Sequence, residues 1–102
     1  MNRSSLFGPI GLAMRAGKII SGEDQVLDAI KKKRAFLVFL ASDAGINTTK
    51  RITDKSSFYG IPLSMELNTQ EISNCIGKDN RKVIAIIDRR FANMIVEAIN
   101  EI

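Results

Sequence analysis

Apolar residues are spaced along this chain in two ways, one typical of helices and one typical of buried strands. Two runs are almost entirely apolar, "AFLVFLA" at 35–41 and "KVIAIID" at 82–88. Runs of this kind predict strands that are covered on both faces. Shorter strands are predicted at 18–20 and 61–67. Apolar residues at helical spacing predict helices over 4–18, 23–33, 48–60, 68–77 and 89–100.

Polar residues and glycines at the ends of these segments predict where the helices begin and end. Asn68, followed three residues later by Glu71, predicts a capping box at the start of the fourth helix. Asp88 is placed to cap the last helix, because its carboxylate can accept from the first backbone N–H groups. Gly60 is placed to end the third helix, since glycine adopts the left-handed conformation at low cost.

The alternation of helices with apolar strands predicts an α/β fold. We expect a three-layer α/β/α sandwich with a small mixed four-stranded sheet. No linker, repeat or low-complexity tract interrupts the pattern, so residues 1–102 are predicted to form a single domain. Binding sites in such sheets gather at loops that join strand ends to helix starts. We expect those loops at 21–22, at 42–45 and after Asp88.

Composition narrows the function chiefly through what is missing. The chain has no histidine, which removes the usual general base at neutral pH and the commonest metal ligand. Its single cysteine, Cys75, excludes an internal disulfide framework and suits a reducing cytoplasm. The chain also lacks the glycine motifs that bind phosphate or dinucleotide. We therefore predict no catalytic residue, no metal and no cofactor. The longest apolar run, at 35–41, is too short to cross a bilayer, so no membrane partner is expected.

The stretch "SGEDQVLDAIKKKR" at 21–34 separates its charges, with Glu23 and Asp24 at one end and four bases at the other. Helix electrostatics alone could explain this, because acids stabilise the first turn and bases the last by about 0.3–1 kcal/mol each. The alternative is an edge that recognises RNA. Carboxylates and amides at a helix start can accept from guanine, backbone N–H groups can hold phosphate, and lysines supply attraction.

Two further patterns carry weaker signals. "GPIG" at 8–11 imitates a GxxG loop that clamps a nucleic-acid backbone, although a packing role for its glycines is the stronger interpretation. The aromatic residues, five Phe and one Tyr, fall mostly on faces predicted to be buried. No platform for stacking bases is therefore predicted.

Three stretches carry a resemblance to a known family. They are "GLAMRAGKIISGEDQVLDAIKKKRAFLVFLASDAG", "TDKSSFYGIP" and "IGKDNRKVIAIID", and the first combines "RAGK", "SGED" and "LASDA". In these stretches the chain resembles the kink-turn RNA-binding ribosomal protein family of archaeal L-seven-Ae and L-thirty-e type, and it is most similar to a bacterial branch. The resemblance implies an α/β/α sandwich that binds sharply bent RNA built around sheared guanine–adenine pairs. It also implies that the helix after the first strand enters the widened groove through its N-terminus.

The resemblance places the family's RNA-contacting motif on Gly22, Glu23, Asp24, Gln25 and Asp28. Gly22 matches the motif's glycine, and Gln25 keeps an acceptor where the family has glutamate. Asp24 replaces an amide by a carboxylate and loses its donor. Asp28 places a negative charge where the family has lysine, which would repel phosphate.

Two other contact regions of the family also differ in this chain. The acid that often holds a flipped-out base corresponds approximately to Gly45, which has no side chain. The final contact loop, usually partly apolar, corresponds to "KDNR" at 78–81, which suits phosphate better than stacking.

These patterns and the resemblance together predict a non-catalytic, cytoplasmic, monomeric RNA-binding protein. Its predicted partner is structured RNA, ribosomal or otherwise kink-turn-like, and the resemblance implies a context with the ribosome or translation factors. The alternative is a protein–protein interaction module of the same fold that has lost specific RNA binding, which Asp28 and the modest net charge of +4 favour. The predicted RNA-binding residues are Lys18, Ser21, Gly22, Glu23, Asp24, Gln25, Asp28, Lys31, Lys32, Lys78 and Arg81.

Overall fold

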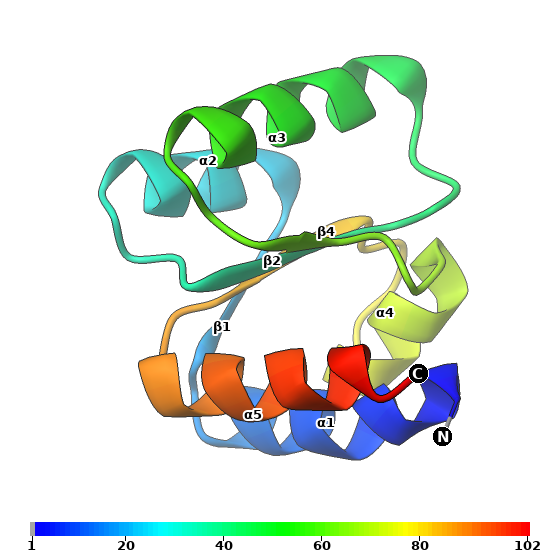
Figure 1. Cartoon of the computed structure of the whole chain (residues 1–102). Coiled ribbons are helices and arrows are strands. Elements are labelled where there is room, and N and C mark those ends of the chain that lie inside the picture. Colours follow the sequence, from blue (N-terminus) through cyan, green and yellow to red (C-terminus); the bar gives the residue numbers. More distant parts are fainter. Residues whose placement is uncertain (1) are drawn as a thin grey trace.

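A four-stranded sheet lies at the centre of the fold, with helices on both of its faces (Figure 1). The computed structural model describes residues 2–102. The strands are β1 (Ile19–Ser21), β2 (Leu37–Leu40), β3 (Leu63–Ser64) and β4 (Val83–Ile86). The helices are α1 (Phe7–Arg15), α2 (Glu23–Lys31), α3 (Ile46–Phe58), α4 (Thr69–Ile76) and α5 (Arg89–Asn100), and a 3-10 helix, η1 (Arg3–Leu6), precedes α1.

The direction of β4 decides which loops meet. The strand order is β1-β4-β2-β3, with β4 antiparallel to both neighbours and β3 parallel to β2. β1, β2 and β3 therefore run the same way and end at one edge of the sheet, where β4 begins. We call it the helix-start edge, because α2, α3 and α4 begin there. The backbone joins its parts directly: the Gly22 N–H donates to the Val83 carbonyl at 3.0 Å, and the Ala41 N–H to the Lys82 carbonyl at 2.7 Å.

Both faces of the sheet are buried, as the apolar runs predict. Phe39 and Ile84 point into a core beneath α1, α4 and α5, whereas Val38 and Ala85 point into a second core beneath α2 and α3. Successive residues of a strand face opposite sides, so a strand between two helical layers needs apolar residues at every position. The predicted three-layer α/β/α sandwich with a mixed four-stranded sheet is confirmed.

Several predicted boundaries are corrected by the structure. The strand predicted at 61–67 pairs with β2 only at Leu63 and Ser64, after which the chain leaves the sheet to begin α4. The helix predicted to reach Lys33 ends at Lys31, since Lys33 has a positive φ of 59°. α3 begins at Ile46, two residues before its predicted start.

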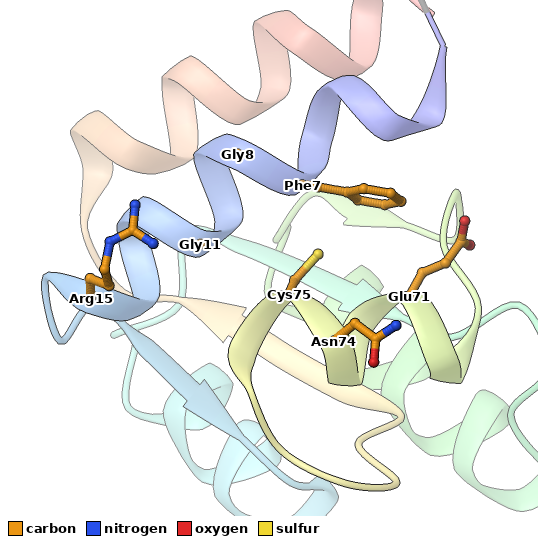
Figure 2. A pocket seen from close by; sticks show the side chains of 7 residues that line it. All are labelled: Phe7, Gly8, Gly11, Arg15, Glu71, Asn74 and Cys75. Atoms are coloured by element: carbon orange, nitrogen blue, oxygen red, sulfur yellow. The ribbon is translucent and has the colours of Figure 1, made fainter.

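Figure 2 shows that the "GPIG" stretch lies inside α1, beside α4. The prediction that this stretch forms a loop that clamps a nucleic-acid backbone is therefore wrong. The packing interpretation is also wrong: a Cβ on Gly8 would meet nothing within 4 Å, and one on Gly11 would make only ordinary contacts at 3.7 and 3.8 Å. The two glycines instead widen a groove of about 380 Å³ lined by Phe7, Gly8, Gly11, Arg15, Glu71, Asn74 and Cys75. Burial raises the pKa of the Cys75 thiol to about 11, so it stays protonated at neutral pH.

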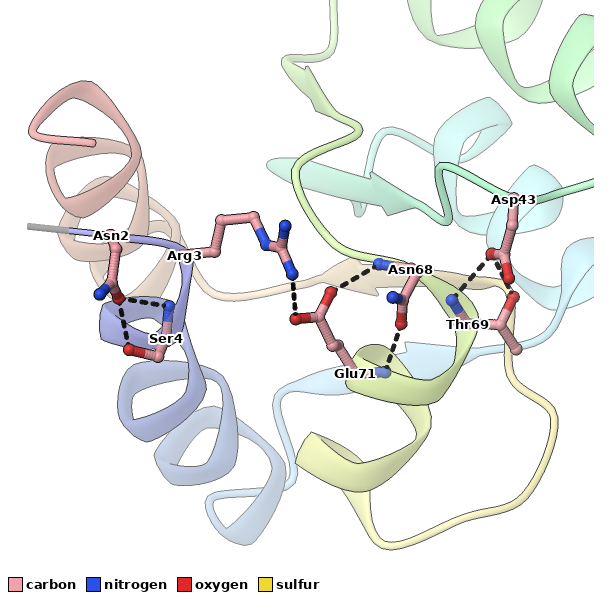
Figure 3. Close-up of polar contacts among 7 residues, drawn as sticks. All are labelled: Asn2, Arg3, Ser4, Asp43, Asn68, Thr69 and Glu71. Atoms are coloured by element: carbon pink, nitrogen blue, oxygen red, sulfur yellow. Dashed lines mark hydrogen bonds and ion pairs between the residues drawn. The ribbon is translucent and has the colours of Figure 1, made fainter.

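The start of α4 is closed by side chains of the protein itself (Figure 3). The Glu71 N–H donates to Asn68 Oδ1 at 2.9 Å, and the Asn68 N–H donates to Glu71 Oε1 at 3.0 Å, which confirms the predicted capping box. Asp43, in the loop after β2, accepts from the Thr69 N–H at 2.9 Å and from the Thr69 hydroxyl at 2.7 Å. Arg3 adds an ion pair to Glu71 at 2.6 Å. The backbone N–H groups of Thr69 and Glu71, in the first turn of α4, are therefore bound by side chains of the protein.

Candidate nucleic-acid interface

The junction between β1 and α2 depends on Gly22. Its φ of 101° and ψ of 146° form a conformation that L side chains rarely adopt, so glycine allows β1 to lead straight into the helix. Gly22 is also the N-cap of α2, and within residues 2–102 no side-chain hydrogen bond caps this end of the helix. Because the first N–H groups of a helix have no partner within the helix, they are free here to bind an acceptor from outside.

A small cavity lies against this helix tip. It has a volume of about 190 Å³ and is built from three segments: the β1–α2 junction, the first turn of α3, and the loop between α4 and β4. The Arg81 guanidinium lies beside Gly22, since a Cβ placed there would be 3.7 Å from Arg81 Nη1. The same Cβ would be 2.6 Å from Gln25 Oε1, so the Gln25 side chain folds back over the glycine. The residues that line the cavity are Gly22, Glu23, Thr48, Asn80, Arg81, Lys82 and Val83.

Two basic side chains, Arg81 and Lys82, line this cavity. The ion pairs found within residues 2–102 involve neither Arg81 nor Lys82. The Arg81 N–H donates to the hydroxyl of the buried Ser73 at 2.8 Å, and Lys82 Nζ donates to Asn80 Oδ1 at 2.8 Å. These bonds anchor the loop while both positive charges remain available to an anion. The polar loop predicted at 78–81 is confirmed, with Lys78 exposed at its start.

Glu23 faces α3 rather than solvent. Its Oε1 accepts from the Thr48 hydroxyl at 2.6 Å, and its Oε2 forms an ion pair with Arg51 Nη2 at 2.5 Å without hydrogen-bond geometry. Only 21% of the Glu23 side chain is exposed. The carboxylate therefore fixes the tip of α2 against the first turns of α3, and its negative charge is shared with Arg51.

The remaining acceptors of the predicted motif lie on the open side of α2. Asp24 and Gln25 are exposed in its first turn, and Asp28 is exposed one turn later. Asp28 Oδ2 lies 3.1 Å from Lys32 Nζ, an ion pair between residues four apart on the helix. The negative charge that departs from the family motif therefore has a cation beside it.

Four predicted residues lie away from the cavity or are less accessible than expected. Lys18 precedes β1 at the opposite edge of the sheet, where its carbonyl accepts from the Ile87 N–H at 2.9 Å. Lys31 and Lys32 lie at the far end of α2, about 13 Å from its tip by the helical rise over nine residues. Ser21 is half-buried in β1.

The loop at Asp88 joins the end of β4 to the start of α5, as expected, but it does not lie at the helix-start edge. β4 runs antiparallel to β1 and β2, which sends its end to the opposite edge. Asp88 does cap α5 as predicted, accepting from the Arg90 and Phe91 N–H groups at 2.9 and 3.1 Å. The Phe91 hydrogen bond is the main reason that the pKa of Asp88 lies below its usual value.

Residues that sequence reasoning missed complete the cavity. Thr48, Asn80 and Lys82 line it but were not predicted as site residues. Thr48 lies in the first turn of α3. Taking Gly45 as the N-cap of that helix would have placed Thr48 in its first turn from the sequence. Gly45 is indeed the N-cap of α3, so the loop after β2 offers no side chain at that position. The acid nearest in sequence, Asp43, is already bonded to Thr69.

Two other kinds of site are absent from the part of the chain that the structure describes. No helix within residues 2–102 is long and apolar enough to cross a membrane. The same residues contain no cluster of three or more Cys, Asp or Glu side chains that could hold a metal ion. The tip of α2, with Arg81 and Lys82 beside it, is the candidate interface on the helix-start edge.

Comparison with known proteins identifies the family of this chain. The sequence model of the ribosomal protein L7Ae/L30e/S12e/Gadd45 family matches residues 5–96. The chain belongs to this family. That membership confirms the resemblance seen in the sequence, including its bacterial branch. The chain is 45% identical over 98 residues to the RNA-binding protein YlxQ of Enterococcus faecium, covering 96% of this chain and 94% of that protein. It is 39% identical over 100 residues to the RNA-binding protein YlxQ of Bacillus subtilis (strain 168), covering 98% and 100%.

Solved structures show the family fold directly. A protein of unknown function from Bacillus halodurans superposes with a TM-score of 0.89 at 38% identity, covering 93% of this chain and 96% of that one. The 15.5kD RNA binding protein of Giardia lamblia superposes with a TM-score of 0.82, covering 94% and 82%. Its identity is only 17%, so this second likeness concerns the fold alone.

Proposed function

We propose that this member of the L7Ae family is a non-catalytic cytoplasmic protein that binds structured, kink-turn-like RNA in a ribosomal or translational context. The family and the names of two relatives as RNA-binding proteins support RNA as the partner. The observation that carries the proposal is the uncapped tip of α2 at Gly22, flanked by Arg81 and Lys82. An uncapped helix start beside basic side chains that form no ion pair suits a phosphate backbone.

Each part of the tip has a separate task in this proposal. The first N–H groups of α2 hold a phosphate, and Arg81 and Lys82 neutralise it and its neighbours. Gln25 and Asp24, exposed beside them, accept from the edges of guanine in sheared pairs, which an ordinary duplex does not present. Glu23 takes no base; it positions the tip through Thr48 and Arg51. Lys78 adds attraction that does not depend on RNA sequence.

The protein–protein module remains the second candidate, because α2 exposes Asp24 and Asp28 on the same side as Gln25. The two candidates differ in their response to salt. RNA binding through phosphates should weaken with a log–log slope of roughly −0.7 to −0.9 per phosphate contacted. Undetectable RNA binding at low salt would favour the protein–protein module.

Fluorescence anisotropy with two labelled RNAs tests the proposal. One RNA is a duplex containing a kink-turn, and the other is a continuous duplex of similar length. We expect the protein to prefer the kink-turn, and Gln25→Ala to reduce that preference by about 1–3 kcal/mol. Arg81→Ala should weaken binding to both RNAs, because it removes a phosphate contact. Equal affinity of the parent protein for both RNAs would contradict kink-turn recognition.

Arg90→Ala is the matched control for Arg81→Ala. It removes the same charge from the opposite edge of the sheet. The Arg90 side chain there is 92% exposed, and its Nη2 lies 3.9 Å from Asp88 Oδ2 in a long ion pair. A general charge effect would weaken binding in both variants alike, whereas the proposed interface predicts a larger loss for Arg81→Ala.

A further inference from the structure

A second groove runs between α2 and α3, beyond the cavity at the helix tip. Its volume of about 530 Å³ is larger than that of the tip cavity. It falls within the range of about 300–1,000 Å³ typical of sites for small ligands. The residues that line it are Leu27, Lys31, Arg51, Asp54, Lys55 and Phe58.

Phe58 is the unusual residue of this groove. It is the last residue of α3, and 80% of it is exposed to solvent. Its ring meets that of Tyr59 edge to face, with centroids 5.0 Å apart and planes at 77°. Tyr59 packs against the core beneath α2 and α3, so it supports the exposed ring from one side. Phe58 is thus an exception to the prediction that aromatic residues lie on buried faces and offer no stacking surface.

The charges around Phe58 favour an anionic occupant. Lys31, Arg51 and Lys55 line the groove with one carboxylate, Asp54. Arg51 is paired with Glu23, so Lys31 and Lys55 are the cations that have no acidic partner among the described residues. Asp54 is itself paired with Lys50, whose Nζ lies 3.4 Å from its Oδ2. A positive groove with an aromatic ring is the combination by which proteins bind single-stranded nucleic acid, because any base can stack on the ring while lysines track the phosphates.

The groove and the tip cavity are related through one ion pair. Arg51 lines the groove, and its partner Glu23 lines the cavity beside Gly22. α2 and α3 both start at the helix-start edge, so their far ends, with Lys31 and Phe58, lie at the same end of the groove. A strand of RNA that leaves the tip therefore has a basic path toward the exposed ring.

We propose that this groove binds an unpaired extension of the RNA held at the tip of α2. A base stacks on Phe58, Leu27 forms the apolar floor, and Lys31 and Lys55 neutralise the phosphates on either side. This inference rests on the proposed function, because it needs the RNA duplex at the tip to bring the extension to the groove. The protein then recognises a bent duplex together with an adjoining single strand.

The experiment compares two kink-turn RNAs, one blunt and one with an unpaired pyrimidine extension of about six nucleotides, within the usual site size for single strands. We expect the extension to increase the affinity of the parent protein. Phe58→Ala and Phe58→Leu should lower affinity for the extended RNA about fivefold or more, from the usual contribution of one stacked base. Both variants should bind the blunt RNA as the parent does. Phe58→Trp should keep the gain, because it retains a π face.

Met94→Ala is the matched control, since Met94 is an apolar residue 40% exposed on α5, in the opposite helical layer. It should change neither affinity. A parent protein that binds both RNAs equally would overturn the groove proposal while leaving the proposed function intact, and the groove would then suit an acidic protein partner. Phe58→Leu behaving like the parent would overturn base stacking. Failure of the parent to bind the blunt RNA would instead count against the proposed function.

Discussion

Two helices begin at the same edge of the sheet, and their first turns are completed in opposite ways. α4 starts at Asn68, whose side chain accepts from the Glu71 N–H while Glu71 accepts in return. Asp43 adds two further acceptor bonds to Thr69. α2 starts at Gly22, which has no side chain to accept anything. One helix tip is closed by the protein, and the other is left open.

The difference is also electrostatic. Two carboxylates, from Asp43 and Glu71, are bound at the start of α4 and complement the positive end of its dipole. At the start of α2, Glu23 turns to α3, and Arg81 and Lys82 stand beside Gly22. Asp24 is exposed in the first turn of α2, so both tips carry carboxylates, but only the α2 tip has basic side chains without an acidic partner beside it. The comparison indicates that open backbone donors suit an anionic ligand only when the surrounding side chains also favour it.

The largest effect is expected from Gly22→Ala. A side chain must adopt the φ of 101° that glycine now supplies, which costs about 1–3 kcal/mol for backbone strain of this kind. The free energy of unfolding, measured with urea, should fall by that amount, and the affinity for kink-turn RNA should fall as well because the tip is displaced.

Gly8→Ala is the control for Gly22→Ala. Gly8 lies in α1 with open space around the position of a Cβ, so alanine should stabilise the protein by up to about 0.5–1 kcal/mol. RNA affinity should stay unchanged. A Gly22→Ala protein as stable as the parent would show that the junction tolerates a side chain and does not require glycine.

A smaller effect is expected from Asn68→Ala at the closed tip. Removing this cap should lower the free energy of unfolding by about 1 kcal/mol, the usual cost of losing an N-cap side chain. The affinity for kink-turn RNA, measured where the variant is fully folded, should not change. If RNA affinity fell as far as it does for Gly22→Ala, the two tips would not differ in function.

The smallest effect is expected on the free energy of unfolding at low pH. The Thr69 hydroxyl is the main cause of the lowered pKa of Asp43, and the Asn68 N–H is the main cause for Glu71. Such carboxylates bind protons more weakly in the folded state. Their contribution is therefore complete above the ordinary values of 3.8 and 4.5 and is lost as pH falls through the lowered folded pKa values. Urea unfolding between pH 5 and pH 3 should show a shallower loss of stability in Asp43→Asn than in the parent. Parallel curves for the two proteins would rule out this contribution.

Much of the fold could be predicted because it depends on local patterns. The runs at 35–41 and 82–88 predict strands buried on both faces, and the pair Asn68 and Glu71 predicts its own capping box. Each of these features lies within a few residues of chain. Hydrophobic period and capping chemistry therefore determine them directly.

The placement of loops could not be predicted in the same way. The sequence at 82–88 does not reveal that β4 runs antiparallel to both neighbours. That direction places Asp88 at the edge of the sheet opposite the helix-start edge. Pairing direction depends on how distant segments meet, and local alternation of apolar residues does not contain it.

The candidate site could be predicted only in part for the same reason. Gly22 and Arg81 were expected at the site, and they lie side by side. The inward turn of Glu23 depends on Thr48 and Arg51, which lie far along the chain on α3. The exposure of Phe58 likewise depends on which neighbours cover the end of α3, so its helical position alone does not reveal it.

The open tip of α2 is the central claim, and chemical-shift mapping by NMR tests it most directly. The ¹⁵N-labelled protein is titrated with kink-turn RNA while the amides of both helix tips are followed. The account predicts the largest shifts at the amides of Glu23, Asp24 and Gln25, and small shifts at Thr69 and Glu71. Shifts concentrated at the start of α4, with none at the start of α2, would contradict it.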